Sequence, residues 1–418
     1  MASTGSSAPG TLRALLRSGT GIAVAMAVQN VATYGFTIIA ARRLGPAEYS
    51  AVASLMGILL IVVVVSLGLQ ATGARKIAAT PDRREEIEAA LMSATYRAAL
   101  GLGALCLLLT PLITWGLQLE AWPAALMIGV AAVPLTIMGG QAGVLQGEQR
   151  WGALGGIYLG IGLGRLVIAG ATMLLIPNAF GAMLGVAIAA WVPALVGALA
   201  LGHVGGVATD RRSLADRGEQ ILREVTRNSH ALLAFFALSN ADVVVARIVL
   251  DDHVAGLYAG GLILTKAVLF LPQFVVVIAF PSMASSTERR SMYLKGLLLV
   301  ATIGVIASLG AIVLSGLAVT FVGGPAYAEI EPLVGLFAAL GTLLAMIQLM
   351  VYEVVARQHS ASVWVLWAGL VAVAGPASYV ASEGSLLVSV VAIDLIVLLA
   401  LLGTALLHRP GSRSPTAQ

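Results

Sequence analysis

Long apolar stretches alternate with short polar segments along this chain. Stretches such as 51–73, 98–119 and 121–147 are free of charged residues. Each is at least as long as the roughly 20 residues that an α-helix needs to cross a hydrocarbon core. The pattern therefore predicts twelve transmembrane helices. We expect them near 20–41, 50–72, 93–115, 122–146, 152–176, 180–201, 229–249, 254–281, 296–320, 332–355, 361–381 and 386–407.

The composition supports an all-α polytopic membrane protein. Of 418 residues, 59% are hydrophobic and only 11% are charged, and the mean hydropathy is +0.96. A soluble domain has about 25% charged residues. These values exclude a soluble enzyme, a nucleic-acid-binding domain and a disulfide scaffold, and the lone Cys106 has no partner for an internal disulfide.

The basic residues indicate how the helices are oriented. With the N-terminus inside, 19 of the 24 lysines and arginines fall on the cytoplasmic side and only Arg42 and Arg43 fall outside. The other three, Arg165, Arg247 and Lys266, lie in or near the spans. Cytoplasmic loops of membrane proteins carry an excess of basic residues. The asymmetry predicts cytoplasmic termini, and it explains the pI of about 9.4 without nucleic acid.

The two halves of the chain are similar. The segment Leu44–Ala53 follows the first predicted span, and Leu250–Ala259 follows the seventh, 206 residues later. Each half has an even number of spans, so both run in the same direction, as parallel repeats do around a central cavity. The predicted organisation is an N-terminal six-helix lobe at 1–202, a cytoplasmic linker at 203–228, a C-terminal six-helix lobe at 229–408 and a disordered cytoplasmic tail at 409–418.

Three ionisable residues fall inside predicted spans. Arg165, Asp242 and Lys266 each lie about 12 or 13 residues from the start of a span, which is roughly 18–20 Å along a helix and close to the membrane midplane. Ionisable groups at this depth face a cavity or a partner. Two cations against one anion predict a site for an anionic substrate such as a phosphate or diphosphate. The structural alternative is that Asp242 pairs with Lys266 or Arg165.

Other polar residues extend the predicted site. Arg42, Arg43 and Arg247 are expected near its outer mouth, where the alternative is that they reach to the membrane interface. Asn30, in the first span, is a further substrate-binding candidate. Asp394 and Glu353, in spans twelve and ten, join Asp242 as candidates for coupling to H⁺ or Na⁺.

Signatures of enzymatic chemistry are missing from the sequence. All five histidines lie in predicted loops or at span ends, and none forms a metal-ligand cluster with the cysteine. The many glycines do not form a phosphate-binding loop. We therefore expect no catalytic residue, no metal site and no cofactor, and the chain is not expected to be an enzyme.

Several motifs resemble the polysaccharide-transporter branch of the multidrug/oligosaccharidyl-lipid/polysaccharide (MOP) exporter superfamily, the O-antigen-type flippases. The motifs are Ala41–Tyr49, Leu67–Gln70 followed by Arg75–Lys76, Leu145–Arg150, Asn240–Asp242, Ala255–Ala259, Lys266, Phe270–Pro272 and Phe280–Pro281. The resemblance implies twelve helices in two lobes around a central cavity lined by Asp242 and Lys266. It also implies transport of undecaprenyl-diphosphate-type oligosaccharides across the cytoplasmic membrane by alternating access, for cell-surface polysaccharide synthesis.

Alternatives remain open at the level of sequence. An ion-coupled multidrug antiporter of the same superfamily would share the fold, but it would be expected to present carboxylates to a cationic drug. A lipid II flippase usually has extra spans. A membrane glycosyltransferase or polymerase would need a large catalytic loop, and a non-transporting scaffold would not need the intramembrane charges. The ratio of 21 Arg to 3 Lys is typical of a GC-rich bacterial gene, which favours a multi-pass protein of a bacterial cytoplasmic membrane.

Overall fold

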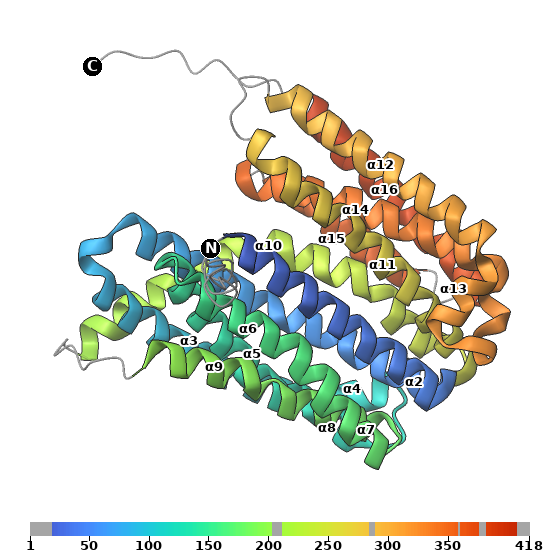
Figure 1. Ribbon diagram of the computed structural model, residues 1–418, viewed down its shortest axis with the longest axis horizontal. Helices are drawn as coiled ribbons and strands as arrows, with labels where there is room; N and C mark the ends of the chain where they lie inside the picture. Colours follow the sequence, from blue (N-terminus) through green and yellow to red (C-terminus); the bar gives the residue numbers. More distant parts are fainter. Residues whose placement is uncertain (1–18, 203–210, 284–288, 358–359, 376–381, 408–418) are drawn as a thin grey trace, which may run out of the picture.

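The computed structural model describes residues 19–202, 211–283, 289–357, 360–375 and 382–407, and these residues form helices without strands (Figure 1). Glu353 belongs to a described helix, but its side chain lies outside the described part of the structure. The helices of the first half are α2 (Gly19–Ala79), α3 (Arg84–Leu108), α4 (Thr110–Gly116), α5 (Trp122–Gly147), α6 (Trp151–Gly164), the π turn η2 (Arg165–Ala169), α7 (Gly170–Leu175), α8 (Ala179–Ala189) and α9 (Trp191–Leu201), with the 3₁₀ turn η1 (Pro81–Arg83) after α2. Those of the second half are α10 (Arg211–Val249), α11 (Asp252–Met283), α12 (Arg289–Val313), α13 (Ser315–Val322), the 3₁₀ segment η3 (Gly324–Leu333), α14 (Val334–Arg357), α15 (Ser360–Ala374) and α16 (Glu383–Leu407).

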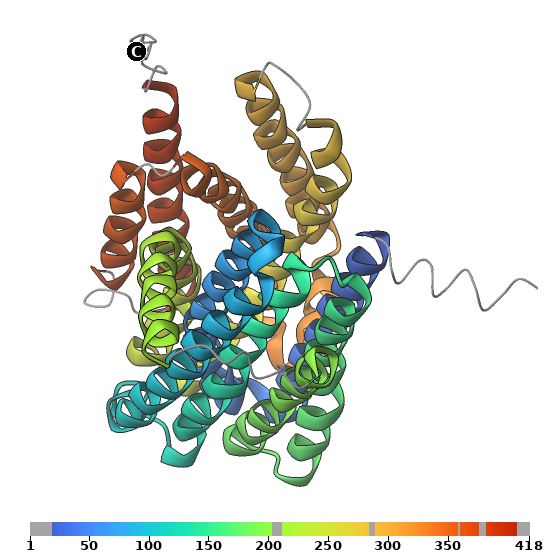
Figure 2. The ribbon, with the colours of Figure 1, turned by 90° about the vertical axis from the view of Figure 1, so that its left-hand side faces the viewer.

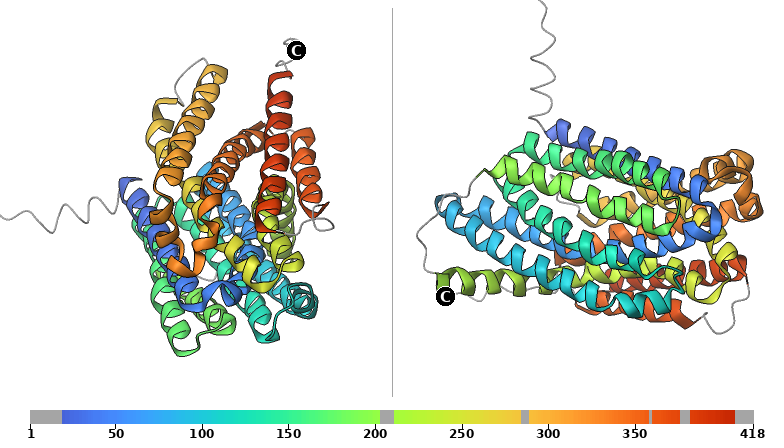
Figure 3. Two further views of the ribbon diagram at one scale, coloured as in Figure 1. Left: turned by 90° about the vertical axis from the view of Figure 1, so that its right-hand side faces the viewer. Right: turned by 90° about the horizontal axis from the view of Figure 1, so that it is seen from below.

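The helices account for the twelve predicted spans. Within the described residues, nine helical segments are long and apolar enough to cross a membrane. One of these is α2, which folds back on itself and supplies the first two spans. The helices α11 and α15 complete the set as the eighth and eleventh spans. The axes of the membrane-spanning helices run roughly parallel (Figure 3). The predicted all-α, two-lobe membrane fold is confirmed.

The first two spans are joined by a single residue rather than by a loop. Gly45 has φ 73° and ψ 173°, and the residues on both sides of it are helical. Glycine has no Cβ and enters this region of backbone space without strain, while the following Pro46 favours the start of a new helix. The loop predicted at 42–49 is therefore almost absent, and Arg42 and Arg43 lie on the last turn of the first arm of α2.

The helix α10 differs from the predicted linker and seventh span. It runs without a break from Arg211 to Val249, so the described part of the linker is an extension of the span. Ile221 and Val225 of this extension pack among Leu69 and Leu91 of the first half. The sequence predicts a linker here, but these apolar residues four positions apart give the extension a face that packs on the N-terminal lobe.

The two lobes meet along α2, α10 and α11 (Figures 1 and 2). The largest buried side chains of the main core come from both lobes and include Phe36, Leu55, Phe235, Tyr258 and Phe337. Many large apolar side chains are instead exposed on the outer faces, among them Leu108, Trp115, Leu175, Leu199 and Val313. Such faces are unfavourable in water, and they fit a surface that contacts lipid.

Candidate functional site

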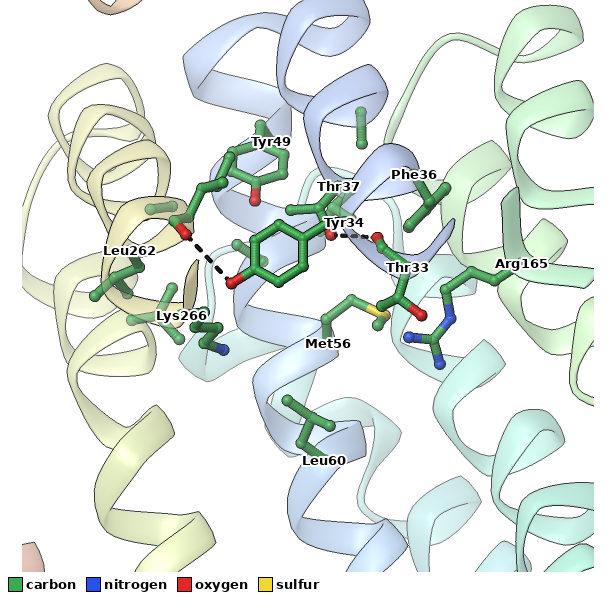
Figure 4. Close-up of a pocket in the computed structure, with 16 residues that line it drawn as sticks. Thr33, Tyr34, Phe36, Thr37, Tyr49, Met56, Leu60, Arg165, Leu262 and Lys266 are labelled. Atoms are coloured by element: carbon green, nitrogen blue, oxygen red, sulfur yellow. Dashed lines mark hydrogen bonds between the residues drawn. The ribbon is translucent and has the colours of Figure 1, made fainter. Parts of the chain in front are cut away.

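A cavity of about 160 Å³ lies between the two lobes (Figure 4). Both arms of α2 line it through residues spaced three or four apart, which is one face of each helix. The remaining wall comes from η2, α10 and α11. The lining residues are Thr33, Tyr34, Phe36, Thr37, Ala40, Tyr49, Val52, Ala53, Met56, Leu60, Arg165, Val243, Ala259, Leu262, Ile263 and Lys266.

Arg165 reaches the cavity from the N-terminal lobe. It is the first residue of the π turn η2, which interrupts the helical span between α6 and α7. π turns are rare in proteins, and those that occur are often found at functional sites. Arg165 is half-buried, and within the described residues its guanidinium forms neither an ion pair nor a hydrogen bond. A membrane-embedded cation without a protein partner is unfavourable.

Lys266 reaches the same cavity from the C-terminal lobe, on the side opposite Arg165 (Figure 4). Its ammonium donates a hydrogen bond of 2.8 Å to Oδ1 of the buried Asn240. It also interacts electrostatically with Asp242. The amide oriented by α10 therefore holds the lysine at the cavity wall while leaving donors of the ammonium available.

Asp242 lies next to the cavity but does not line it. Only 2% of the residue is exposed, and its Oδ1 accepts a hydrogen bond of 2.8 Å from the backbone N–H of Val243. Its Oδ2 accepts one of 3.1 Å from the hydroxyl of Tyr258. The structure thus brings Asp242 and Lys266 into one electrostatic group, with the lysine alone facing the cavity.

A second carboxylate is buried close to Asp242. Asp394, on α16, is 2% exposed and interacts electrostatically with Asp242 and Tyr258. Its Oδ1 has no hydrogen-bond partner among the described residues. With both carboxylates ionised, the single ammonium of Lys266 would leave one negative charge uncompensated in this group, and a proton or another cation would neutralise it.

The other predicted substrate-binding residues do not line the cavity. Arg42 and Arg43 are exposed at the outer end, where Arg42 donates to the backbone oxygen of Thr320. Arg247 is buried and bonded between the lobes. Asn30 is partly exposed and does not line the cavity.

The sequence did not single out the hydroxyl groups of the cavity. Thr33, Tyr34, Thr37 and Tyr49 line it on the two arms of α2. Tyr34 donates a long hydrogen bond of 3.5 Å to the backbone oxygen of Ile263 across the lobes (Figure 4). Their spacing on one helical face, at 33 and 37, was the available signal. Among the described residues, no group of three or more His, Cys, Asp and Glu side chains could hold a metal ion.

Comparison with known proteins identifies the fold through structure. No family model and no curated protein matches the sequence. The eukaryotic MATE transporter AtDTX14 is 14% identical, with a TM-score of 0.56 over 96% of this chain and 97% of that chain. This chain has the MATE fold. A MATE transporter in a bent conformation is 14% identical, with a TM-score of 0.52 over 94% of this chain and 96% of that one.

A MOP superfamily transporter from Pyrococcus furiosus also matches. It is 13% identical, with a TM-score of 0.50 over 93% of each chain. At such low identity the similarity concerns the arrangement of the helices. The MATE fold has twelve helices in two lobes, which agrees with the spans described above. The similarity therefore shows the fold alone.

Proposed function

We propose that this protein is a transporter that works by alternating access and moves an anionic lipid-linked oligosaccharide, of the undecaprenyl-diphosphate type, across a bacterial cytoplasmic membrane. The observation that carries the proposal is the polarity of the cavity between the lobes. Arg165 and Lys266 are its charged lining residues, and no carboxylate is among the sixteen side chains that line it in the described structure. A diphosphate offers the negative charge and the oxygen acceptors that such a pair of cations would bind.

The two cations belong to different lobes, which supports a role in binding a substrate between them. A guanidinium binds phosphate oxygens in a bidentate manner, and an ammonium supplies a compact charge with three donors. The hydroxyl groups of Thr33, Thr37 and Tyr49 would then lie beside the phosphates, where they can bind sugar hydroxyls. The lipid tail would remain in the bilayer beside the apolar outer faces of the helices.

The same polarity argues against the drug-antiporter alternative. A cationic drug would meet two positive charges in the cavity instead of a carboxylate. One of the proteins that share the fold, the MOP superfamily transporter from Pyrococcus furiosus, is described as having a binding pocket of reverse polarity that suggests a different function. The fold is therefore compatible with binding pockets of more than one polarity.

We also propose that the buried carboxylates couple transport to a cation, H⁺ or Na⁺. Asp242 and Asp394 share one electrostatic group with Lys266. A cation entering this group would change the charge next to the lysine, and so the affinity of the cavity for an anion. Coupling of this kind needs no direct contact between ion and substrate.

Reconstituted vesicles would test the proposed substrate. The experiment measures transfer of a fluorescent lipid-diphosphate sugar between leaflets for the wild type, Arg165→Gln and Lys266→Gln. Arg43→Gln is the matched control, because it removes an exposed cation outside the cavity. Loss of one charge-assisted interaction of about 1.5–3 kcal/mol predicts a roughly 10- to 150-fold lower transfer rate for the two cavity variants.

Three results would be informative. Full activity of folded Arg165→Gln and Lys266→Gln would refute the assignment of these residues to the substrate. Exchange of a cationic drug for an ion by the wild type, without transfer of the lipid, would refute the substrate class. Loss of transfer in the cavity variants, with Arg43→Gln active, is the expected outcome.

A further inference from the structure

Among the described residues, Arg247 is the most extensively bonded charge between the two lobes, and it does not line the cavity. Arg247 lies near the outer end of α10, and only 3% of it is exposed. Its Nε donates to the backbone oxygen of Leu117 at 3.0 Å, its Nη2 to that of Gln118 at 3.3 Å and its Nη1 to Oγ of Ser50 at 2.7 Å. Its Nη1 also forms an ion pair with Asp252.

The carbonyl groups that accept hydrogen bonds from Arg247 lie in the turn that ends α4. Gln118 has φ 50°, a left-handed conformation that is unusual for a residue other than glycine. It terminates α4, and the N–H of Leu119 bonds back to the oxygen of Thr114 at 3.0 Å. This turn aims the oxygens of residues 117 and 118 at the guanidinium. A rigid fork of donors fits such a set of acceptors, and an ammonium would not.

The four partners divide between the lobes. Ser50, Leu117 and Gln118 belong to the N-terminal lobe, whereas Asp252 begins α11 in the same lobe as Arg247. Only two residues separate α10 from α11, so this ion pair can persist when the lobes move. The side chain of Asp252 is 48% exposed, so water already reaches it. Separation of the lobes at the outer side would therefore remove the acceptors of Arg247 on the N-terminal lobe. It would leave the ion pair with Asp252 in place.

We propose that Arg247 is an outer-gate lock. With the outer side closed, it is bonded to Ser50, Leu117 and Gln118 of the opposite lobe; when that side opens, it releases them and retains Asp252. The surrounding contacts support this role, because Tyr327 donates to the backbone oxygen of Ala41 at 3.2 Å across the same seam. The buried charge keeps a partner in both states, so opening does not leave it unpaired in an apolar environment.

The lock predicts opposite effects for two substitutions. Arg247→Lys removes the fork that binds the N-terminal lobe and destabilises the closed state. Asp252→Asn removes the partner that remains after opening and destabilises the open state. A purely structural ion pair would give the same sign for both changes, since either one breaks it.

Distances between the lobes measured by double electron–electron resonance would test this. Spin labels are placed at Glu120 and Ala326, which are exposed at the outer ends of the two lobes. The background is Cys106→Ser, and the protein is held in lipid nanodiscs without substrate, so the result is independent of the proposed function. Arg43→Gln is the control, because Arg43 forms no ion pair or hydrogen bond within the described residues.

We expect Arg247→Lys to raise the ratio of outer-open to outer-closed protein about tenfold or more, from the loss of charge-assisted hydrogen bonds. Asp252→Asn is expected to lower it. This variant is also measured together with Gly256→Ala, whose added methyl group would meet the backbone of Pro46 and open the seam, so that a decrease can be detected. Shifts of both variants in one direction, or no difference from Arg43→Gln, would overturn the proposal. If Arg247→Lys does not fold, the sign of the Asp252→Asn shift decides.

Discussion

The substitution Gly256→Ala, which adds one methyl group, should separate the two lobes at their outer side. Gly256 lies in α11 against the turn of α2, and an added Cβ would be 1.9 Å from the backbone oxygen of Pro46 and 2.1 Å from its carbonyl carbon. Real Cβ contacts are longer than 3.0 Å. The two backbones would therefore have to separate by at least about 1.1 Å at this point. Neither atom belongs to a flexible side chain that could turn aside.

The strain of this contact destabilises only the outer-closed conformation. Overpacking a well-packed contact costs about 1–3 kcal/mol. Because Gly256 and Pro46 belong to different lobes, opening the outer side relieves the contact. The strain therefore raises the ratio of outer-open to outer-closed protein by about 5- to 150-fold, the range that corresponds to 1–3 kcal/mol.

The assay is the distance between spin labels at Glu120 and Ala326 in nanodiscs. Gly310→Ala is the matched control, because a Cβ there would meet nothing within 4 Å. Alanine at such a helix position should stabilise the fold by about 0.5–1 kcal/mol and leave the distances unchanged. The reasoning would be wrong if folded Gly256→Ala gave the same distance distribution as Gly310→Ala, or a more closed one.

Three further changes have distinct expected outcomes. If the buried carboxylates bind a cation as proposed, Asp394→Asn should keep the fold and weaken the dependence of thermal stability on sodium and pH relative to the wild type, measured by scanning fluorimetry; an unchanged dependence would exclude Asp394 from the group of Asp242 and Lys266. Gly139→Ala, whose Cβ would lie 2.2 Å from Oγ and 2.5 Å from the backbone oxygen of Ser66, should lower the stability by about 1–3 kcal/mol, whereas Gly101→Ala should not. Glu224→Gln breaks exposed ion pairs; it should cost less than about 1 kcal/mol, and the loss should vanish in thermal unfolding at about 1 M salt.

The sequence predicts the number and positions of the helices well because the bilayer imposes a length on each apolar stretch. The sequence predicts the connections between the helices less well. The polar residues around Gly45 look like a loop, yet one glycine with a left-handed φ is enough to reverse the chain. The charged residues before the seventh span look like a linker, yet Ile221 and Val225 hold that segment on the other lobe as part of α10.

For the candidate site, too, the sequence predicts some features and not others. Depth in the membrane can be counted along a helix, so the sequence alone assigns Arg165 and Lys266 to the same level, and both line the cavity. The direction in which a side chain points depends on distant segments. The acceptors of Arg247 at Leu117 and Gln118 are about 130 residues away and owe their position to a turn that no motif reveals. A charge near the outer mouth therefore looked like a substrate ligand although its donors already have acceptors.

The near absence of a loop at Gly45 has a consequence for the biogenesis of the protein. The first arm of α2 has two arginines near each end, Arg13 and Arg17 before it and Arg42 and Arg43 on its last turn, so it has no charge bias of its own. Arg75 and Lys76 follow only at the end of the second arm. Because one residue joins the arms, we expect them to enter the bilayer together as a hairpin that carries Arg42 and Arg43 across. We therefore expect the orientation of the nascent chain to be decided when the second hydrophobic segment emerges.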